Sequence, residues 1–272
     1  MLTNIIEELK VELRKRSIAQ GHINTFCDAL VRLLTRKAHN NDLTDTESDY
    51  LEILLQSYLP GKRYMSWEER QLSLQDTSLT VFTDDKLYYN ACLSQGVKEC
   101  MKWKGKPLFK TANDLVILNT ILWDLKPSTI IELGSGKGES ARYMQDMMHL
   151  YNVDVNIFSF DINMPVETKE GNISFFQGDC SKIDTLKRVD YSTLPHPWLI
   201  VEDAHVNISS VISFLVEHGQ AGDIIFIEDS ENFQNDVENL LTSIPNLYID
   251  THYVDYFGPN NTSAKNSILK LL

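Results

Sequence analysis

The chain is poor in cysteine and contains no long hydrophobic run. Its four cysteines, at positions 27, 92, 100 and 180, have no zinc-type spacing and indicate no disulfide framework. No apolar run approaches the roughly 18 residues needed to span a bilayer. Acidic residues interrupt the apolar positions of the first segment, at Glu7, Glu8 and Glu12, which does not fit a signal peptide. We therefore expect a reducing, cytoplasmic location and no membrane association.

Basic residues are also in the minority. The chain has 25 lysines and arginines against 38 aspartates and glutamates, for a formal net charge of −13. Such a charge opposes non-specific binding to nucleic acids and to anionic membranes. At 272 residues, of which 43% are hydrophobic, the chain is long enough to bury a sizeable core. These features favour a globular protein that acts on a small molecule.

Two regions differ in their pattern. Within residues 1–59, apolar side chains such as Ile5, Leu9 and Leu13 recur at helical spacing. Residues 61–110 are rich in aromatic side chains, which suit a helical cap that packs on the second region, a substrate lid or a subunit interface. We predict a helical N-terminal region over 1–100, which would allow a homo-oligomer, and a second domain over 101–272.

From residue 111 onward, helical and strand patterns alternate. A helix is expected over about 113–125, ending before Pro127. Apolar, β-branched runs predict strands near 129–133, 155–160, 173–176, 198–202, 223–227 and 247–253. This alternation predicts an α/β domain whose mostly parallel sheet carries helices on both faces. Ligands should then bind at the carboxyl ends of the strands.

A glycine-rich turn follows the first of these strands, with glycines at 134, 136 and 138. Gly134 and Gly136 can adopt positive φ angles and let the backbone approach a ligand closely. The helix that begins near Gly138 offers unpaired N–H groups. A dinucleotide site would want a third small residue at position 139, where this chain has Glu139. The spacing instead favours S-adenosylmethionine (SAM), with an ordinary strand-to-helix turn as the alternative.

Acidic residues end the neighbouring strands. Glu132 would lie near an ammonium or ribose group, Asp161 could accept from both ribose hydroxyls, and Asp179 could accept from the adenine amino group. Each aspartate could instead cap a turn or helix. The predicted cofactor-binding residues are Glu132, Gly134, Ser135, Gly136, Gly138, Ser140, Asp161, Gly178, Asp179 and Cys180.

Two acidic clusters follow the strands at 198–202 and 223–227, namely Glu202-Asp203 and Glu228-Asp229. Adjacent parallel strands lie about 4.8 Å apart, so carboxylates at their ends can converge. Converging carboxylates repel one another unless a cation holds them, and oxygen ligands favour Mg²⁺, with Mn²⁺ or Ca²⁺ as alternatives. The alternative is that these acids cap the following helices.

Within the first cluster, successive side chains point to opposite faces of the strand, and we favour Asp203 over Glu202 as a metal ligand. His205 lies two residues further on. A histidine is a suitable general base near neutral pH, so we predict this role for His205 beside Asp203; a structural histidine is the alternative.

Several motifs together resemble a known family. They are Trp103-Lys-Gly-Lys-Pro107, Asn113-Asp-Leu115, Leu125-Lys-Pro-Ser-Thr-Ile-Ile-Glu132 with its glycine turn, Gln177-Gly-Asp-Cys-Ser181, Glu202-Asp-Ala-His-Val-Asn207, Ile227-Glu-Asp229 and Phe257-Gly-Pro-Asn-Asn-Thr262. Over about 100–272 the chain resembles the SAM-dependent methyltransferases that carry the name cephalosporin hydroxylase, and their macrocin-type O-methyltransferase relatives.

This resemblance implies a Rossmann-like class I SAM-dependent methyltransferase fold. It also implies a divalent metal with Asp203, Glu228 and Asp229 as ligands. The expected reaction is methyl transfer to a hydroxyl of a small molecule such as a sugar, a polyketide or another secondary metabolite. Three alternatives are a non-haem iron hydroxylase, for which one histidine among several acids is an unusual ligand set, a SAM-binding protein without catalysis, and a nicotinamide-dependent dehydrogenase.

Overall fold

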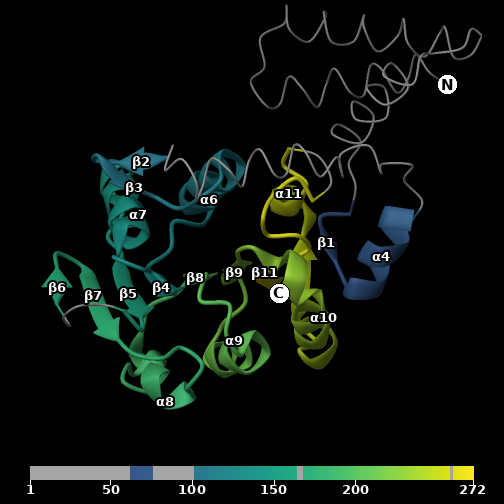
Figure 1. Cartoon of the computed structure of the whole chain (residues 1–272). Coiled ribbons are helices and arrows are strands. Elements are labelled where there is room, and N and C mark those ends of the chain that lie inside the picture. Colours follow the sequence, from purple (N-terminus) through teal and green to yellow (C-terminus); the bar gives the residue numbers. More distant parts are fainter. Residues whose placement is uncertain (1–61, 76–100, 164–167, 258–259) are drawn as a thin grey trace, which may run out of the picture. The chain divides into compact units, whose positions relative to one another are not determined.

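The computed structural model describes residues 62–75, 101–163, 168–257 and 260–272 (Figure 1). All of them belong to one compact unit, Lys62–Thr77 and Phe82–Leu272. The helices predicted within 1–59, and most of the predicted N-terminal region 1–100, lie outside the described residues. No helix in the described part is both long and apolar enough to cross a membrane.

A nine-stranded sheet forms the centre of this unit, in the order β1-β10-β11-β9-β8-β4-β5-β7-β6. Five neighbouring strands pair in parallel, as predicted. They are β4 (Thr129–Leu133), β5 (Asn156–Asp161), β7 (Ile173–Gln177), β8 (Trp198–Glu202) and β9 (Ile224–Ile227). The strand β11 (Ile268–Leu271) joins β9 and β10 (Leu247–Asp250) in antiparallel pairing, and the short strands β1 (Tyr64–Met65) and β6 (Lys169–Glu170) form the two edges.

The prediction erred at the C-terminal part of the sheet. The strand expected over 247–253 ends at Asp250, because the Asp250 side chain accepts a hydrogen bond from the His252 backbone N–H at 3.1 Å. This bond caps the short helix α11 (Thr251–Val254). Strands β11 and β1 were not predicted, since runs of four and two residues carry little pattern of their own.

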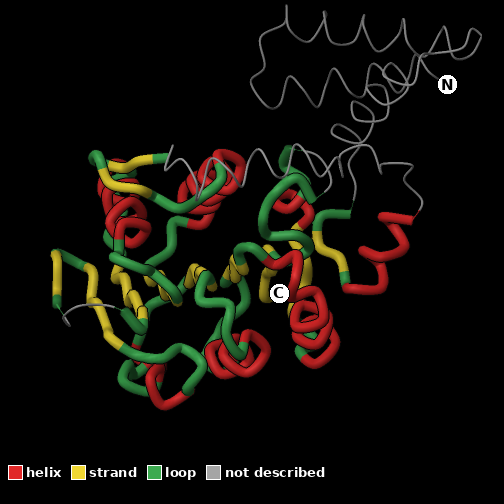
Figure 2. The backbone as a smooth tube through the Cα atoms, in the orientation of Figure 1, coloured by secondary structure: helices red, strands yellow, loops and turns green. Residues whose placement is uncertain are grey.

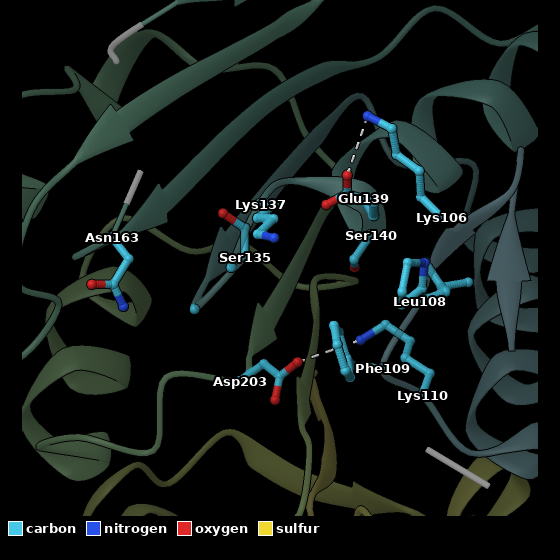
Figure 3. A pocket seen from close by; sticks show the side chains of 13 residues that line it. Lys106, Leu108, Phe109, Lys110, Ser135, Lys137, Glu139, Ser140, Asn163 and Asp203 are labelled. Carbon is cyan, nitrogen blue, oxygen red and sulfur yellow. Dashed lines mark ion pairs between the residues drawn. The ribbon is translucent and has the colours of Figure 1, made fainter. Parts of the chain in front are cut away.

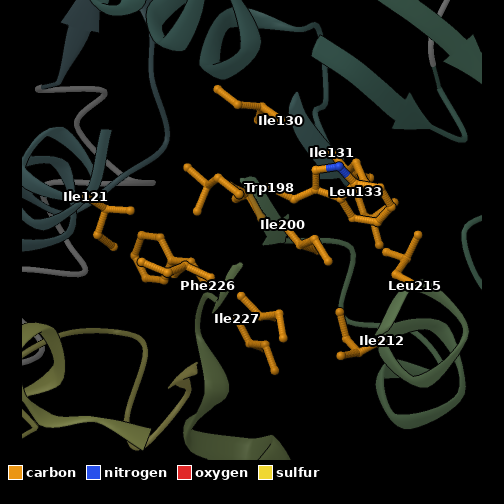
Figure 4. Close-up of a cluster of buried hydrophobic side chains, with 14 of the residues drawn as sticks. Ile121, Ile130, Ile131, Leu133, Trp198, Ile200, Ile212, Leu215, Phe226 and Ile227 are labelled. Atoms are coloured by element: carbon orange, nitrogen blue, oxygen red, sulfur yellow. The ribbon is translucent and has the colours of Figure 1, made fainter. Parts of the chain in front are cut away.

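Helices cover both faces of the sheet, as predicted (Figures 1 and 2). One face carries α6 (Ala112–Leu125) and α7 (Glu139–Leu150), and the other carries α8 (Ile183–Leu186), α9 (Ile208–Val216) and α10 (Gln234–Ser243). Figure 4 shows the strand side chains between Ile121 of α6 and Ile212 and Leu215 of α9. Because β4, β8 and β9 are buried on both sides, their sequences are almost continuously apolar.

Chain order places a crevice at the centre of the sheet. The chain passes from β4 to β5 and β7 on one side, then crosses back to β8 on the other side of β4. The helices that follow β4 and β8, α7 and α9, therefore lie on opposite faces of the sheet. This switch point is where open α/β sheets bind their ligands.

The segment 62–75 is attached to the C-terminal part of the unit by two arginines that pair with aspartates. Arg63 forms two hydrogen bonds, of 2.9 and 3.0 Å, with the Asp250 carboxylate. Arg70, from helix α4 (Trp67–Gln75), is 3% exposed and pairs with both Asp255 oxygens at 2.6 and 2.7 Å. Its Nε also donates to Asn266 at 2.9 Å. These contacts join a segment before residue 100 to the C-terminal part of the sheet.

We expect Arg70→Met to lower the free energy of unfolding by about 3 kcal/mol, because it removes a buried guanidinium and leaves the partly buried Asp255 carboxylate without its charged partner. Urea denaturation followed by circular dichroism measures this loss. Lys62→Met removes the exposed ion pair with Glu69 and should leave the unfolding midpoint almost unchanged. Equal stability of the two variants would contradict the anchoring role of Arg70.

Candidate active site

The glycine turn after β4 has the backbone geometry that the sequence predicted. Gly134 and Gly136 adopt φ angles of +85° and +56°. A Cβ atom on Gly134 would lie 2.4 Å from backbone atoms of both Asp203 and Ala204, so glycine is needed here for the close approach of the loop after β8. A Cβ atom on Gly136 would meet no described protein atom within 4 Å. Of these two glycines, Gly136 is therefore the one that leaves open space for a ligand.

Two buried carboxylates support this turn. The Asp161 oxygens accept hydrogen bonds from the Gly136 N–H at 2.8 Å and from the Asn163 N–H at 2.6 Å. Glu132 is 1% exposed and accepts from the Ser159 hydroxyl at 2.8 Å. Burial raises the pKa of Glu132 above its usual value. Since a carboxylate has about four acceptor positions, Asp161 keeps capacity for a ligand hydroxyl.

Among the residues after β7, Gly178 and Cys180 contact the end of β5, whereas Asp179 makes local contacts. Asp179 accepts from the Ser181 backbone N–H at 3.0 Å and from its hydroxyl at 2.6 Å, and these bonds lower the pKa of Asp179. This is the turn-capping arrangement that the sequence left open as an alternative. Cys180 is buried, and burial raises the pKa of its thiol to about 12. A Cβ atom on Gly178 would lie 2.3 Å from the Thr185 side chain.

A cavity of about 680 Å³ opens above the carboxyl ends of β4 and β8 (Figure 3). The glycine turn and the start of α7 form one wall, and residues 106–110 form another, with Asp203 between them. The Ser135 hydroxyl is buried and has no hydrogen-bond partner among the described residues. The volume is typical of sites for nucleoside-sized ligands. Four predicted cofactor-binding residues line this cavity, namely Gly134, Ser135, Gly136 and Ser140.

The loop after β8 is shaped by a buried glutamate. Glu202 is fully buried, and its Oε1 accepts from the backbone N–H groups of Ala204 and His205 at 3.1 and 2.9 Å. Burial raises the pKa of Glu202 to about 7, against the effect of these two hydrogen bonds. His205 adopts a φ of +56°, which turns its ring back toward β9. Glu202 thus positions the loop and does not line the cavity, whereas Asp203 does.

Asp203, His205 and Asp229 converge, with one possible ligand atom from each lying within 4.8 Å of the other two. The His205 Nε2 lies 3.7 Å from an Asp203 oxygen and 3.1 Å from the Glu228 carbonyl oxygen. The sequence predicted two of these residues as metal ligands and His205 as a nearby base. Oxygen and imidazole ligands in this arrangement suit a divalent cation.

The third predicted ligand, Glu228, is held by a lysine. Its side chain is fully buried and its Oε1 pairs with the Lys110 ammonium, which is also buried. The Glu228 Oε2 has no hydrogen-bond partner among the described residues. Lys110 Nζ also lies 3.6 Å from an Asp203 oxygen. The dashed line in Figure 3 marks this ion pair. The sequence did not single out Lys110, because its position beside the acids depends on how residues 106–110 fold over the sheet.

The excess of acidic side chains at this edge of the sheet favours the binding of a cation. Burial raises the pKa of Asp203 to about 7, although Lys110 acts in the opposite direction. Burial likewise raises the pKa of Glu228. For Lys110, burial alone would lower the pKa, but Glu228 and Asp203 outweigh it and raise the value. Two carboxylates, those of Asp203 and Glu228, therefore share one ammonium, and the unpartnered Glu228 Oε2 is an oxygen that a divalent cation fits.

Two sequence motifs with no predicted chemical role form hydrogen bonds that support the loop carrying Asp229. Asp114, near the start of α6, accepts from the Ser263 backbone N–H at 3.0 Å. The Ser263 hydroxyl in turn accepts from the Asp229 backbone N–H at 3.2 Å. Asn113 donates to the Asn261 carbonyl oxygen at 3.1 Å. The motif at 113–115 therefore holds the C-terminal segment against the loop that carries Asp229.

Comparison with known proteins agrees with this geometry. Residues 95–205 match the family model described as rhamnosyl O-methyltransferase/CmcI. An apo structure of CmcI is 20% identical, with 86% of this chain and 98% of that chain covered and a TM-score of 0.56. A CmcI structure with Mg and SAM is 21% identical, with 87% and 99% covered and a TM-score of 0.55. The curated proteins contain no match to this chain.

The matched segment carries the glycine turn and the first acidic cluster, so the predicted resemblance to this methyltransferase family is confirmed. The similarity to CmcI over most of the chain confirms the predicted fold, a Rossmann-like α/β fold of class I SAM-dependent methyltransferases. The second acidic cluster lies beyond the matched segment, and only the sheet brings it to the first.

The two glycines of the turn should respond differently to alanine. Gly134→Ala should lower the free energy of unfolding by about 3 kcal/mol, because a positive φ and a backbone clash are both unfavourable. Gly136→Ala should cost about 1 kcal/mol, from its φ angle alone. Denaturation of both variants without ligand measures the difference.

Binding should show the complementary effect. The methyl group of Gly136→Ala points into the open space of the cavity and should weaken SAM binding about tenfold or more, as measured by calorimetry. Unchanged SAM affinity in this stable variant would place the cofactor elsewhere.

Proposed function

We propose that the protein transfers a methyl group from SAM to a hydroxyl oxygen of a small molecule, with a divalent cation at the acidic centre. One observation carries this proposal. The glycine turn, which suits the cofactor, and the cluster of Asp203, His205 and Asp229, which suits a cation, meet at one cavity through Asp203. A sugar, polyketide or other hydroxylated metabolite in the cytoplasm is the acceptor class we expect.

The cavity wall supports SAM as the methyl donor. Open space at Gly136, the unpartnered Ser135 hydroxyl and the acceptor capacity of Asp161 provide a backbone approach, a hydrogen-bonding group and a partner for ribose hydroxyls. Buried Glu132 adds negative charge beneath the turn, which suits a cationic cofactor. The CmcI structure with Mg and SAM supports the same pair of ligands.

The acidic centre would hold the cation through Asp203 and Asp229, with the free Glu228 oxygen as a further donor. A bound Mg²⁺ lowers the pKa of a hydroxyl that it contacts. His205 Nε2 lies 3.1 Å from a carbonyl oxygen, which can only accept, so in this arrangement Nε2 carries the proton. The other ring nitrogen, Nδ1, then carries a lone pair and can act as the general base.

The reaction balances with these groups. The acceptor hydroxyl gives its proton to His205, and its oxygen forms a bond with the methyl carbon. The bond between this carbon and the sulfonium sulfur breaks, and its electron pair stays on sulfur, which leaves S-adenosylhomocysteine. The protein contributes orientation of the acceptor oxygen in line with the methyl group and removal of the proton.

Calorimetric titration of SAM and NAD⁺ into the purified protein, with and without Mg²⁺, tests the cofactor. SAM should bind and NAD⁺ should not. Incubation with methyl-labelled SAM and a panel of hydroxylated metabolites, with and without EDTA, then tests the reaction. SAM binding without metal-dependent transfer to any acceptor would favour a SAM-binding protein without catalysis.

Two aspartate variants should distinguish the residue that binds the cofactor from the residue that binds the metal. Asp203→Asn should lower metal-dependent turnover about 100-fold or more and leave SAM affinity nearly intact, because it alters a cation ligand. Asp161→Asn should weaken SAM binding and leave Mg²⁺ affinity nearly intact. Each variant serves as the control for the other, and equal effects of both on SAM affinity would contradict the assignment.

A further inference from the structure

We propose that Lys110 is a positioning residue of the metal centre, which holds Glu228 and Asp203 in the arrangement that receives the cation. This inference rests on the proposed function, since it concerns the same centre. Lys110 belongs to the cavity wall, and the described polar contacts of its ammonium group are with Glu228 and Asp203. Its role follows from the position of its ammonium group, which provides the hydrogen bond to Glu228 and the nearby positive charge at Asp203.

Lys110 is the only side chain, among the described residues, that donates a hydrogen bond to the Glu228 carboxylate. The lysine side chain is 2% exposed and that of Glu228 is 1% exposed, so solvent contributes little to either. The ammonium occupies Oε1 and leaves Oε2 unpartnered. One oxygen of Glu228 is thereby tied to the protein while the other stays available.

The same ammonium lies 3.6 Å from Asp203, which lines the cavity and belongs to the converging cluster. A single buried charge therefore contacts one carboxylate from the loop after β8 and one from the loop after β9. Together with a divalent cation it would supply three positive charges to Asp203, Glu228 and Asp229. The centre is then neutral with a divalent ion bound.

Lys110 is itself held in place by the segment that follows it. Thr111 caps α6, where its hydroxyl accepts from the Asp114 backbone N–H at 3.1 Å. Asp114 binds the Ser263 backbone, which contacts the Asp229 loop. The lysine and the acids thus share one hydrogen-bonded framework. Outer partners that orient metal ligands typically change metal affinity 10–100-fold when they are removed.

A plain counter-ion would behave differently from a positioning residue. A counter-ion competes with the metal for the carboxylates, so its removal would tighten metal binding. A positioning residue fixes the orientation of the Glu228 carboxylate, so its removal weakens metal binding. The sign of the change in Mg²⁺ affinity therefore separates the two roles.

The test is calorimetric titration of Mg²⁺, and of Mn²⁺ as a second probe, into the full chain and its variants. Lys110→Met should weaken Mg²⁺ binding about 10–100-fold while SAM binding is retained. Lys110→Arg, which keeps the charge, should lose less affinity. Lys104→Met is the matched control, because Lys104 is exposed and pairs with Asp146 away from the cavity, and it should leave Mg²⁺ affinity unchanged.

A double variant keeps the test decisive if Lys110→Met is unstable. Lys110→Met/Glu228→Gln removes both buried charges and should regain stability. Its Mg²⁺ affinity should be close to that of Glu228→Gln alone, because the hydrogen bond from Lys110 goes to Glu228, whereas Asp203 lies 3.6 Å away. Unchanged or tighter Mg²⁺ binding in Lys110→Met, or additive losses in the double variant, would overturn the positioning role. A wild-type protein that binds neither metal would instead refute the metal centre of the proposed function, and this inference with it.

Discussion

The close approach of two loops at Gly134 is the constraint on which the site depends. With no side chain at this position, the turn after β4 lies against the backbone of Asp203 and Ala204. The glycine turn after β4 and the loop that carries Asp203 therefore lie against each other at the carboxyl edge of the sheet. This contact sets the position of Asp203 relative to the cavity. A methyl donor at the glycine turn and a cation at Asp203 could act on the same acceptor molecule only if this position is kept.

Buried charged side chains also determine the conformations of the loops at this edge of the sheet. Glu132, Glu202, Glu228 and Lys110 are all buried, and each of them has a specific partner. Such groups contribute little to stability in themselves, because desolvation offsets much of the Coulomb attraction. Their effect here is orientation. They fix two strand-end loops in conformations with positive φ angles, at His205 and Asp229, that side chains rarely adopt.

The C-terminal segment holds these loops from outside. Asp114 binds residue 263, which contacts the Asp229 loop, and Arg70 binds Asp255 and Asn266 on the same segment. Parts of the chain far apart in sequence thus meet behind the cluster of Asp203, His205 and Asp229. Motifs that have no chemical role of their own can therefore belong to a site, because they position the residues that do.

The sequence by itself determined the parallel α/β core, the glycine turn and the two acidic strand ends, since each follows from local pattern. Apolar runs predict strands, alternate glycines predict a turn with positive φ, and acids at the ends of parallel strands converge at one edge. Only the tertiary structure decided how the acids divide their roles. Glu228 pairs with Lys110, Asp179 caps its own turn, and His205 joins Asp203 and Asp229. These outcomes depend on contacts between distant segments and on the burial of charge, which no local pattern contains.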